Sequence, residues 1–582
     1  LYDYVRNRLS DKGNTIESMV DGDGDIVDSN ADKAELLSET FAKVFTTDNG
    51  CLPPFTHARE AVRDNDYDAN ELFARHVICD LIEKWKKSCC RTPDNLSLFF
   101  LQKIAVTLAA PLEIIFKESY LTSEVPSRWK RSIVTPLKKK PPFSNPSNYR
   151  PVSITSFFCR VFEKCLVNRM AIDCENFDIF PDTQLGFRKN RSVENQMLEC
   201  LNDWSASMNK KEVVDVVYFD YSKAFDTVSH PKLIHKLDKM GFPKLTVKWI
   251  DCYLKDRIFQ VRVNDTLSKE RVVESGVPQG SVLGPMLFNL YTADLPNEIG
   301  PYSCKSMTFA DDLKLYKSFS PGENRIDVQN AIDAIVGWST KWQLSIAGEK
   351  CSVLHIGKED VAANAYVLNG MGIERVDVVR DLGIWVDSRL KFDKHTALIC
   401  QKAIAKTNLL FRVLSSTTVG VYVNAYKTHI RPLLEFCTTV TRPVNLRDRD
   451  KIEKVQNLMT RRIFYKCLGH NYETKPSYAE RNRFLNLHSL EYRRRVCDLK
   501  KVYEMLYFGG RFSRVLPLFF DIVSSFTRGA KFRLHPVREG NRVREEGFAS
   551  RVSKELLKVL KTGDMPTDIK QYRAIIRTLL RE

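Results

Sequence analysis

Residues 306–316 read SMTFADDLKLY, and two short alternating patterns meet there at the acidic pair Asp311 and Asp312. Apolar and polar side chains alternate on each side of the pair, and a period of two is typical of strands. Two strands joined by two acids predict a tight β-hairpin with both carboxylates at its tip. An ordinary turn is the alternative, because Asp is favoured in turns. A third carboxylate elsewhere in the chain would distinguish the two.

That third carboxylate is Asp220. It follows residues 213–219, VVDVVYF, whose β-branched and aromatic side chains predict a buried central strand. If this strand lies beside the hairpin, Asp220 and Asp311 converge at one end of a sheet, where they repel unless cations neutralise them. Oxygen-only ligands suit Mg²⁺, and two such ions can hold the attacking and leaving oxygens of a phosphoryl displacement. The sequence therefore predicts polymerase chemistry.

Length and composition set the frame for this chemistry. At 582 residues, with 43% hydrophobic residues, the chain is long enough for several domains. No run of 18 apolar residues is present, so we expect no membrane span. The 15 cysteines form no C-x-x-C pair, which disfavours a zinc array or a disulfide framework and indicates an intracellular location, in nucleus or cytoplasm. Because the first residue is Leu rather than Met, we expect a segment of a larger polyprotein.

The net charge of +17 is unevenly distributed. Residues 441–582 hold 32 Lys and Arg against 16 Asp and Glu, so almost all of the excess positive charge lies there. A nearly neutral region that carries the acids, followed by a strongly basic one, is what a grip on phosphate backbones requires. A solvated charged surface is the alternative for this region.

Three motifs carry a family resemblance. Residues 309–312, FADD, resemble the [YF]-x-D-D box of reverse transcriptases, residues 220–225 resemble their first aspartate motif, and residues 275–281, SGVPQGS, resemble their Pro-Gln-Gly loop. The wider match is to non-LTR (LINE-type) retrotransposon reverse transcriptases and covers nearly the whole chain. It includes residues 148–153 (NYRPVS), 184–188 (QLGFR), 380–384 (RDLGI), 431–435 (RPLLE) and 491–495 (EYRRR).

The resemblance implies an α+β fold, the right-hand polymerase with fingers, a palm built on an antiparallel sheet, a helical thumb and a mostly helical basic C-terminal region. On this basis we expect six parts. They are a connector (1–80), a helical extension with the fingers (81–210), a palm with the catalytic carboxylates (211–365), a primer-grip region (366–400), a thumb (401–470) and a basic C-terminal region (471–582).

The resemblance also implies roles for individual residues. The catalytic and metal-binding residues would be Asp220, Asp311 and Asp312, with two Mg²⁺ ions, or Mn²⁺ in their place. The nucleotide would be bound by Lys139, Arg150, Phe225, Pro278, Gln279, Gly280 and Lys350. Template and primer would be bound by Gly186, Phe187, Arg188, Leu382, Gly383, Arg461, Arg462, Arg493 and Arg494.

Two of these roles are chemically specific. The aromatic ring of Phe225 would pack under the sugar and leave no room for a 2′-hydroxyl, which favours DNA over RNA synthesis. Lys350 would lie near the departing pyrophosphate and donate a proton to it. A core aromatic is the alternative for Phe225, and the residues before Lys350 depart from the family's pattern.

The resemblance predicts an RNA-directed DNA polymerase that copies element RNA from a DNA 3′-hydroxyl. Its partners would be an RNA template, a DNA primer or target and dNTPs, with an endonuclease encoded upstream and no membrane. Two alternatives stay open. One is a maturase of the group II intron type, and the other is a decayed remnant that only binds RNA.

Overall fold

The computed structural model describes residues 16–55, 66–86, 92–358, 366–471, 473–507, 516, 519–524, 532–536, 547–560 and 568–580. It is an α+β chain, as predicted, with two five-stranded sheets and three short two-stranded ladders beyond a β-hairpin near the N-terminus. Within these ranges no helix is long and apolar enough to cross a bilayer.

The central sheet has the strand order β14-β11-β5-β10-β9. Its strands are β5 (Val213–Phe219), β9 (Lys305–Phe309), β10 (Asp312–Phe319), β11 (Ser352–Ile356) and β14 (Glu374–Val376). The predicted buried strand, β5, is in the middle of this sheet and pairs antiparallel with both β10 and β11. The predicted hairpin is also confirmed, because β9 pairs with β10 and Phe309 lies opposite Asp312.

Both faces of β5 are buried, which explains why its sequence is almost uniformly apolar. Val213 and Val217 belong to one hydrophobic cluster, which also contains residues of α9 (His230–Lys239), α11 (Gly284–Tyr291) and α13 (Ile326–Lys341). Val214 and Val216 belong to a second cluster on the other face. That cluster contains residues of α8 (Val193–Asn209) and of the C-terminal helices α19 (Leu490–Tyr507), α22 (Phe548–Leu560) and α23 (Ile569–Leu579).

A second sheet lies beside the first and has the order β4-β3-β6-β7, with β8 also paired to β6. Its strands are β3 (Arg131–Lys138), β4 (Tyr149–Thr155), β6 (Ile258–Val263), β7 (Thr266–Leu267) and β8 (Arg271–Val272). Helix α2 (Asn30–Ala42) packs on β6, so residues 16–45 complete this sheet's core.

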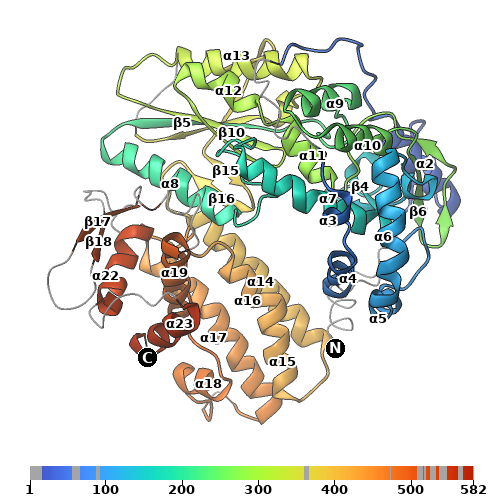
Figure 1. Ribbon diagram of the computed structural model, residues 1–582. Coiled ribbons are helices and arrows are strands. Elements are labelled where there is room, and N and C mark those ends of the chain that lie inside the picture. The colour runs from blue at the N-terminus through green and yellow to red at the C-terminus, as the bar shows by residue number, and fades with distance from the viewer. Residues whose placement is uncertain are drawn as a thin grey trace.

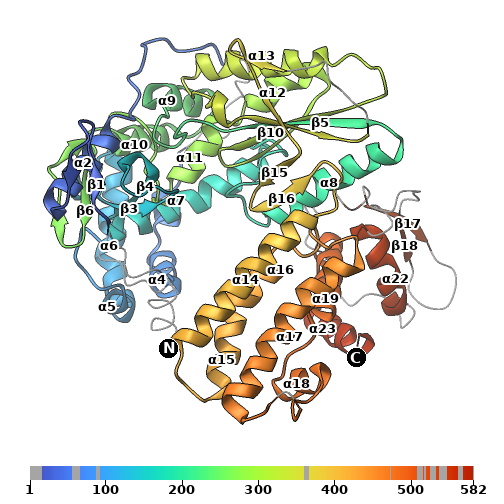
Figure 2. The ribbon, with the colours of Figure 1, turned by 180° about the vertical axis from the view of Figure 1, so that it is seen from behind.

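Figures 1 and 2 show two groups of helices below the level of the central sheet, one on each side of the molecule. One side holds α4 (Arg75–Lys84), α5 (Leu98–Lys103) and α6 (Ala105–Thr122), which pack on α7 (Phe157–Asn176) and α10 (Lys244–Leu254). The other side is an arm of α14 (Asp393–Val413), α15 (Val419–Ala425), α16 (Arg431–Glu435) and α17 (Leu446–Leu468). The short α18 (Tyr478–Phe484) lies at the end of this arm, and the ladder β17 (Phe520–Ser524) with β18 (Phe532–Pro536) lies near α22.

Helix α9 fastens the outer helices to the centre through a buried lysine. Lys236 is fully buried, and its Nζ donates hydrogen bonds to Asp294 Oδ1 and to the Tyr291 carbonyl, both at 2.5 Å. The ring of Trp342 lies 3.6 Å from the same nitrogen. The ammonium is therefore fully partnered, and Asp294 depends on it for charge compensation.

We predict that Lys236→Ala lowers the free energy of unfolding by about 3–5 kcal/mol, because it leaves Asp294 as a buried charge without its partner. Urea denaturation followed by circular dichroism would measure this. Lys239→Ala, on the exposed side of the same helix, should change the value by less than about 0.5 kcal/mol. Equal midpoints for the two variants would contradict the prediction.

Candidate active site

The β-ladder brings the three predicted carboxylates to one end of the central sheet. Leu313 of β10 is opposite Phe219 of β5, so Asp220 directly follows the end of β5 beside the start of β10. Ala310 and Asp311 form the turn between β9 and β10, and Asp312 is the first residue of β10. The predicted juxtaposition of Asp220 with the hairpin tip is thus a feature of the fold.

Burial and neighbouring negative charge both disfavour the ionised forms of Asp311 and Asp312. Burial, with the charge of Asp220 adding to it, raises the pKa of Asp311. The pKa of Asp312 rises to about 6, chiefly because of burial and then because of the charges of Asp311, Asp381 and Asp220. The site therefore concentrates negative charge, which favours the binding of a cation.

Basic side chains face the acids from neighbouring elements. The charges of Arg150, on β4, and of Lys139, just after β3, act to lower the pKa of Asp311. Lys350 Nζ lies 3.9 Å from Asp220 Oδ2, and both side chains are about half exposed. The structure thus brings Lys139, Arg150 and Lys350 to the carboxylates, with positive charge on the side where a triphosphate would need it.

The donor set fits a hard divalent cation. Asp220 and Asp312 line one pocket, and the oxygens of carboxylates and of substrate phosphates are the ligands that Mg²⁺ prefers. Within the described ranges no group of three or more His, Cys, Asp or Glu side chains is already gathered closely enough to hold a metal. The acids supply the right chemistry, and the substrate would have to complete the ligand shell.

The same pocket reaches the turn predicted to hold the primer. Leu382 and Gly383, with φ values of 46° and 90°, form the turn between β15 (Val378–Asp381) and β16 (Ile384–Asp387). The preceding residue, Asp381, forms a buried ion pair with Lys314, which lies two residues after Asp312 on the same face of β10. The ion pair links the Leu382–Gly383 turn to the hairpin that carries Asp311 and Asp312. Neither Lys314 nor Asp381 was predicted from the sequence. A lysine between two leucines in a strand is a signal that could have pointed to Lys314, but not to its partner.

The ring of Phe225 is held in a fixed orientation by two other phenylalanines. It stacks on buried Phe288 of α11, with ring centres 4.5 Å apart and planes 14° apart. Phe187, whose side chain is 60% exposed, meets the Phe225 ring edge-on at 6.2 Å. The Phe225 ring is therefore stacked on the core through Phe288, while the side chain as a whole is only half-buried.

The Pro-Gln-Gly loop packs against the second sheet. The carbonyl of Gln279 accepts a hydrogen bond from the Ser153 amide at 2.7 Å, and its Nε2 donates to Asp226 Oδ2 at 2.8 Å. Gly280 has φ of 115°, and a Cβ there would lie 2.4 Å from the Ser153 carbonyl oxygen. The expected close backbone approach is confirmed. The loop, including Pro278, spans from the turn at Asp226 to β4, where Arg150 lies.

Of the predicted template contacts, Gly186 lies against the hairpin and Arg188 is engaged in the fold. The Arg188 side chain is 4% exposed; it donates to both carboxylate oxygens of Glu175 and to the carbonyls of Pro181 and Gln184. These bonds fasten the 184–188 loop to the end of α7. The phosphate role of Arg188 stays a prediction, and the structure gives it an anchoring role first.

The predicted contacts in the basic region are also partly occupied. Arg493 pairs with Glu435 through two hydrogen bonds, and buried Arg494 donates to Thr438 Oγ1 at 3.0 Å. Arg462 donates to Asn408 Oδ1 at 2.6 Å, and Arg461 is half-buried beside it. Arg493 and Arg494 thus join α19 to the region around α16, and their contact with nucleic acid stays a prediction.

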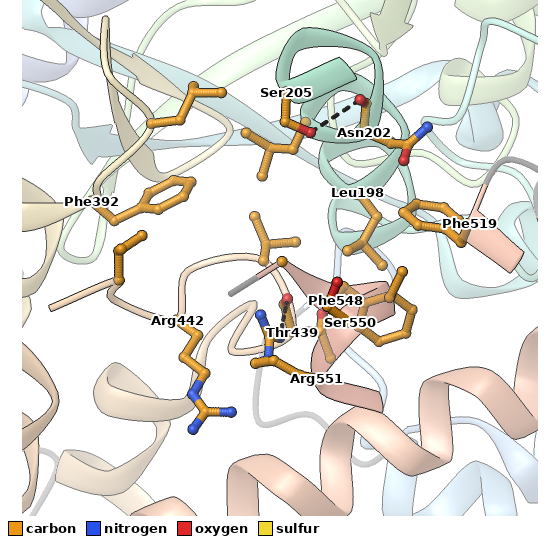
Figure 3. Close-up of a pocket in the computed structure, with 16 residues that line it drawn as sticks. Leu198, Asn202, Ser205, Phe392, Thr439, Arg442, Phe519, Phe548, Ser550 and Arg551 are labelled. Carbon is orange, nitrogen blue, oxygen red and sulfur yellow. Dashed lines mark hydrogen bonds between the residues drawn. The ribbon is translucent and has the colours of Figure 1, made fainter. Parts of the chain in front are cut away.

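A separate pocket lies away from the carboxylates (Figure 3). It is formed by Leu198 and Ser205 of α8, Thr439 and the first turn of α22, including Phe548. At 100° per residue, these α8 positions are opposite Gln196, which lines the pocket at the acids. Figure 3 shows the guanidinium of Arg551 turned toward Thr439, whose carbonyl accepts a hydrogen bond from it at 2.9 Å. The pocket marks the seam between the sheet's cover and the C-terminal helices.

Comparison with known proteins agrees with this geometry. Residues 137–392 match the family model described as reverse transcriptase (RNA-dependent DNA polymerase). The probable RNA-directed DNA polymerase from transposon BS of Drosophila melanogaster is 29% identical over 416 residues, 68% of this chain and 44% of that protein. The RNA-directed DNA polymerase from mobile element jockey of the same species is 28% identical over 381 residues, 64% of this chain and 41% of that protein.

A third relative has a shorter match. The retrovirus-related Pol polyprotein from type-1 retrotransposable element R2 of Popillia japonica is 30% identical over 207 residues, 34% of this chain and 28% of that protein. The chain therefore spans less than half the length of these relatives.

We predict that Asp312→Asn stabilises the metal-free protein at pH 7. The folded pKa of Asp312, about 6, is above its ordinary value of 3.8, so its charge opposes folding fully above about pH 6. This opposition disappears as the pH falls below about 4. Because the side chain is partly solvated, we expect a gain of only about 1 kcal/mol.

Thermal unfolding in EDTA at pH 7 and pH 4 would measure the gain and its loss. Asp333→Asn, exposed on α13, is the control and should change neither midpoint. A gain of equal size at both pH values would show that the effect does not come from the charge.

Proposed function

We propose that this chain, whose residues 137–392 form a reverse transcriptase domain of the non-LTR retrotransposon type, is the RNA-directed DNA polymerase of such an element. The observation that carries the proposal is the position of Asp220 beside the Asp311–Asp312 turn, at a sheet end faced by Arg150 and Lys139. The substrates are an RNA template, a DNA primer with a free 3′-hydroxyl and dNTPs. The endonuclease that the resemblance implies would supply that hydroxyl.

In this proposal the acids hold two Mg²⁺ ions, for which Mn²⁺ can substitute, through Asp220, Asp311 and Asp312. When bound, the ions stabilise charge on the attacking and leaving oxygens of the displacement. Arg150 and Lys139 bind the triphosphate, since a guanidinium can hold two phosphate oxygens in parallel. Lys350, which lies near Asp220, donates a proton toward the departing pyrophosphate.

Selection of the sugar depends on Phe225, whose half-buried ring stacks on Phe288 and meets Phe187 edge-on. A 2′-hydroxyl would meet this ring, so deoxynucleotides are preferred. The Pro278–Gly280 loop borders the nucleotide, and the turn at Leu382 and Gly383 holds the primer end.

The division into parts belongs to the same proposal. The second sheet with α4–α7 would act as fingers, the central sheet as palm and the arm of α14–α17 as thumb. Template and primer would lie between the fingers and the arm, which Figure 2 shows on opposite sides of the molecule below the central sheet. A decayed RNA-binding remnant is disfavoured because every predicted catalytic acid and the ring of Phe225 are present. A group II intron-type maturase would share these acids, and it is disfavoured by the resemblance of residues 431–435 and 491–495 to the non-LTR enzymes.

We predict that Asp311→Ala abolishes primer extension on poly(rA)/oligo(dT) with Mg²⁺, by at least about a thousandfold, because the site loses a direct ligand of its ions. Circular dichroism should report an intact fold. Asp238→Ala, an exposed acid on α9, should leave the rate unchanged. Wild-type extension by Asp311→Ala would refute the polymerase assignment.

We predict that Phe225→Val admits ribonucleotides, because a smaller side chain leaves room for the 2′-hydroxyl. The ratio of rNTP to dNTP incorporation should rise by about tenfold or more. Phe242→Val makes the same change in the buried core and should leave the ratio unchanged. An unchanged ratio for Phe225→Val would place its ring in the core instead of the sugar pocket.

A further inference from the structure

The tip of the catalytic hairpin has a strained backbone. Ala310, the residue before the two acids, has φ of 59°, in the left-handed region that favours glycine and disfavours side chains. Ala310 is the first residue of the two-residue loop between Phe309 and Asp312, where hairpin turns favour positive φ and where glycine, asparagine or aspartate usually stands. Alanine has neither the freedom of glycine nor a polar side chain to stabilise this turn, so a contact from outside the hairpin helps to hold it.

That contact comes from Gln184, whose side chain is almost fully buried. Its Oε1 accepts a hydrogen bond from the Ala310 amide at 3.2 Å, and its Nε2 donates to the Ala310 carbonyl at 3.4 Å. One amide group therefore binds both backbone polar groups of the residue that precedes Asp311. Since a peptide unit fixes the direction of the next Cα, this grip sets where the Asp311 carboxylate points.

The grip is itself anchored. Oε1 of Gln184 also accepts from the Gly186 amide at 2.9 Å, and the Gly186 carbonyl accepts from Asn289 Nδ2, on α11, at 2.8 Å. A Cβ at Gly186 would lie 2.3 Å from the Ala310 nitrogen, so only glycine allows the two backbones to come this close. In addition, the Leu185 amide donates to the Thr308 carbonyl at 3.0 Å.

We infer that Gln184 is a positioning residue for catalysis, which holds the Ala310 turn so that Asp311 and Asp312 present their carboxylates to the metal ions. In this role Gln184 acts through the backbone of Ala310. This inference rests on the proposed function, and it adds a residue outside the acid motifs on which their geometry depends.

The test compares Gln184→Met, which keeps the side-chain volume and removes all three hydrogen bonds, with wild type in Mg²⁺-dependent primer extension. We expect kcat to fall by about tenfold or more, with KM for dNTP changed by less than about threefold, since misplaced catalytic groups reduce the rate more than binding. The Mg²⁺ concentration for half-maximal activity should rise severalfold. A role in stability alone would not change that concentration.

Two further variants make the result decisive. Gln184→Asn keeps an amide that can accept from the Gly186 amide in an Asx-turn but is too short to reach Ala310, so it should fold and still need more Mg²⁺. Gln102→Met is the matched control, because Gln102 Nε2 also donates to backbone carbonyls, including that of Trp85 at 2.8 Å, far from the acids. It should melt at a lower temperature with an unchanged Mg²⁺ requirement.

The outcomes separate the two claims. If the wild type extends no primer, the proposed function fails. If the wild type is active and folded Gln184→Met has the wild-type kcat and Mg²⁺ requirement, the inference is overturned. Should Gln184→Met fail to fold, a wild-type Mg²⁺ requirement in Gln184→Asn overturns it equally.

Discussion

Like charges held together at the end of β5 are the constraint on which the rest of this structure depends. Burial raises the pKa of Asp311 and of Asp312, and the neighbouring charge of Asp220 adds to the shift of both. Left to itself, such a group would separate. The ladder between β5 and β10 prevents this, because moving one strand relative to the other would break seven residue pairs. The central sheet therefore keeps the three carboxylates together against a mutual repulsion that bound cations would reduce.

The central sheet is buried on both faces, and the C-terminal helices, together with α8, cover one of them. Val214 and Val216 of β5 share a cluster with Tyr503 of α19 and Tyr572 of α23. The positively charged C-terminal region is thus part of the core that supports the catalytic strand. Its arginines serve packing as well as charge: Arg551 pairs with buried Asp498, and Arg493 pairs with Glu435. A deletion at residue 441 would uncover the sheet, so point substitutions are the sharper tool for studying its charge.

The hairpin, β5 and the Pro-Gln-Gly loop could be predicted from the sequence because each has a local signature. Alternating side chains, a β-branched run and a Pro-Gln-Gly triplet can be recognised without knowing which residues pack against them. Contacts between residues far apart in the sequence could not be predicted in this way. Arg188 is followed by Lys189 and looks like a phosphate contact, and only the fold shows Glu175 receiving it. The ion pair of Lys314 with Asp381 joins residues 67 positions apart, and no local pattern encodes that contact.

The hairpin that carries Asp311 and Asp312 is held from two sides by different kinds of interaction. On one side Gln184 binds the backbone of its tip through neutral hydrogen bonds. On the other, Lys314 binds Asp381 in a site where both side chains are 3% exposed. A buried ion pair adds little net stability, because desolvation offsets most of its attraction, but removing one partner is strongly unfavourable. Its value here is geometric: it leaves one arrangement of the Leu382 turn relative to Asp312. The turn that would carry the primer end is therefore linked to the hairpin that carries the acids by one buried ion pair.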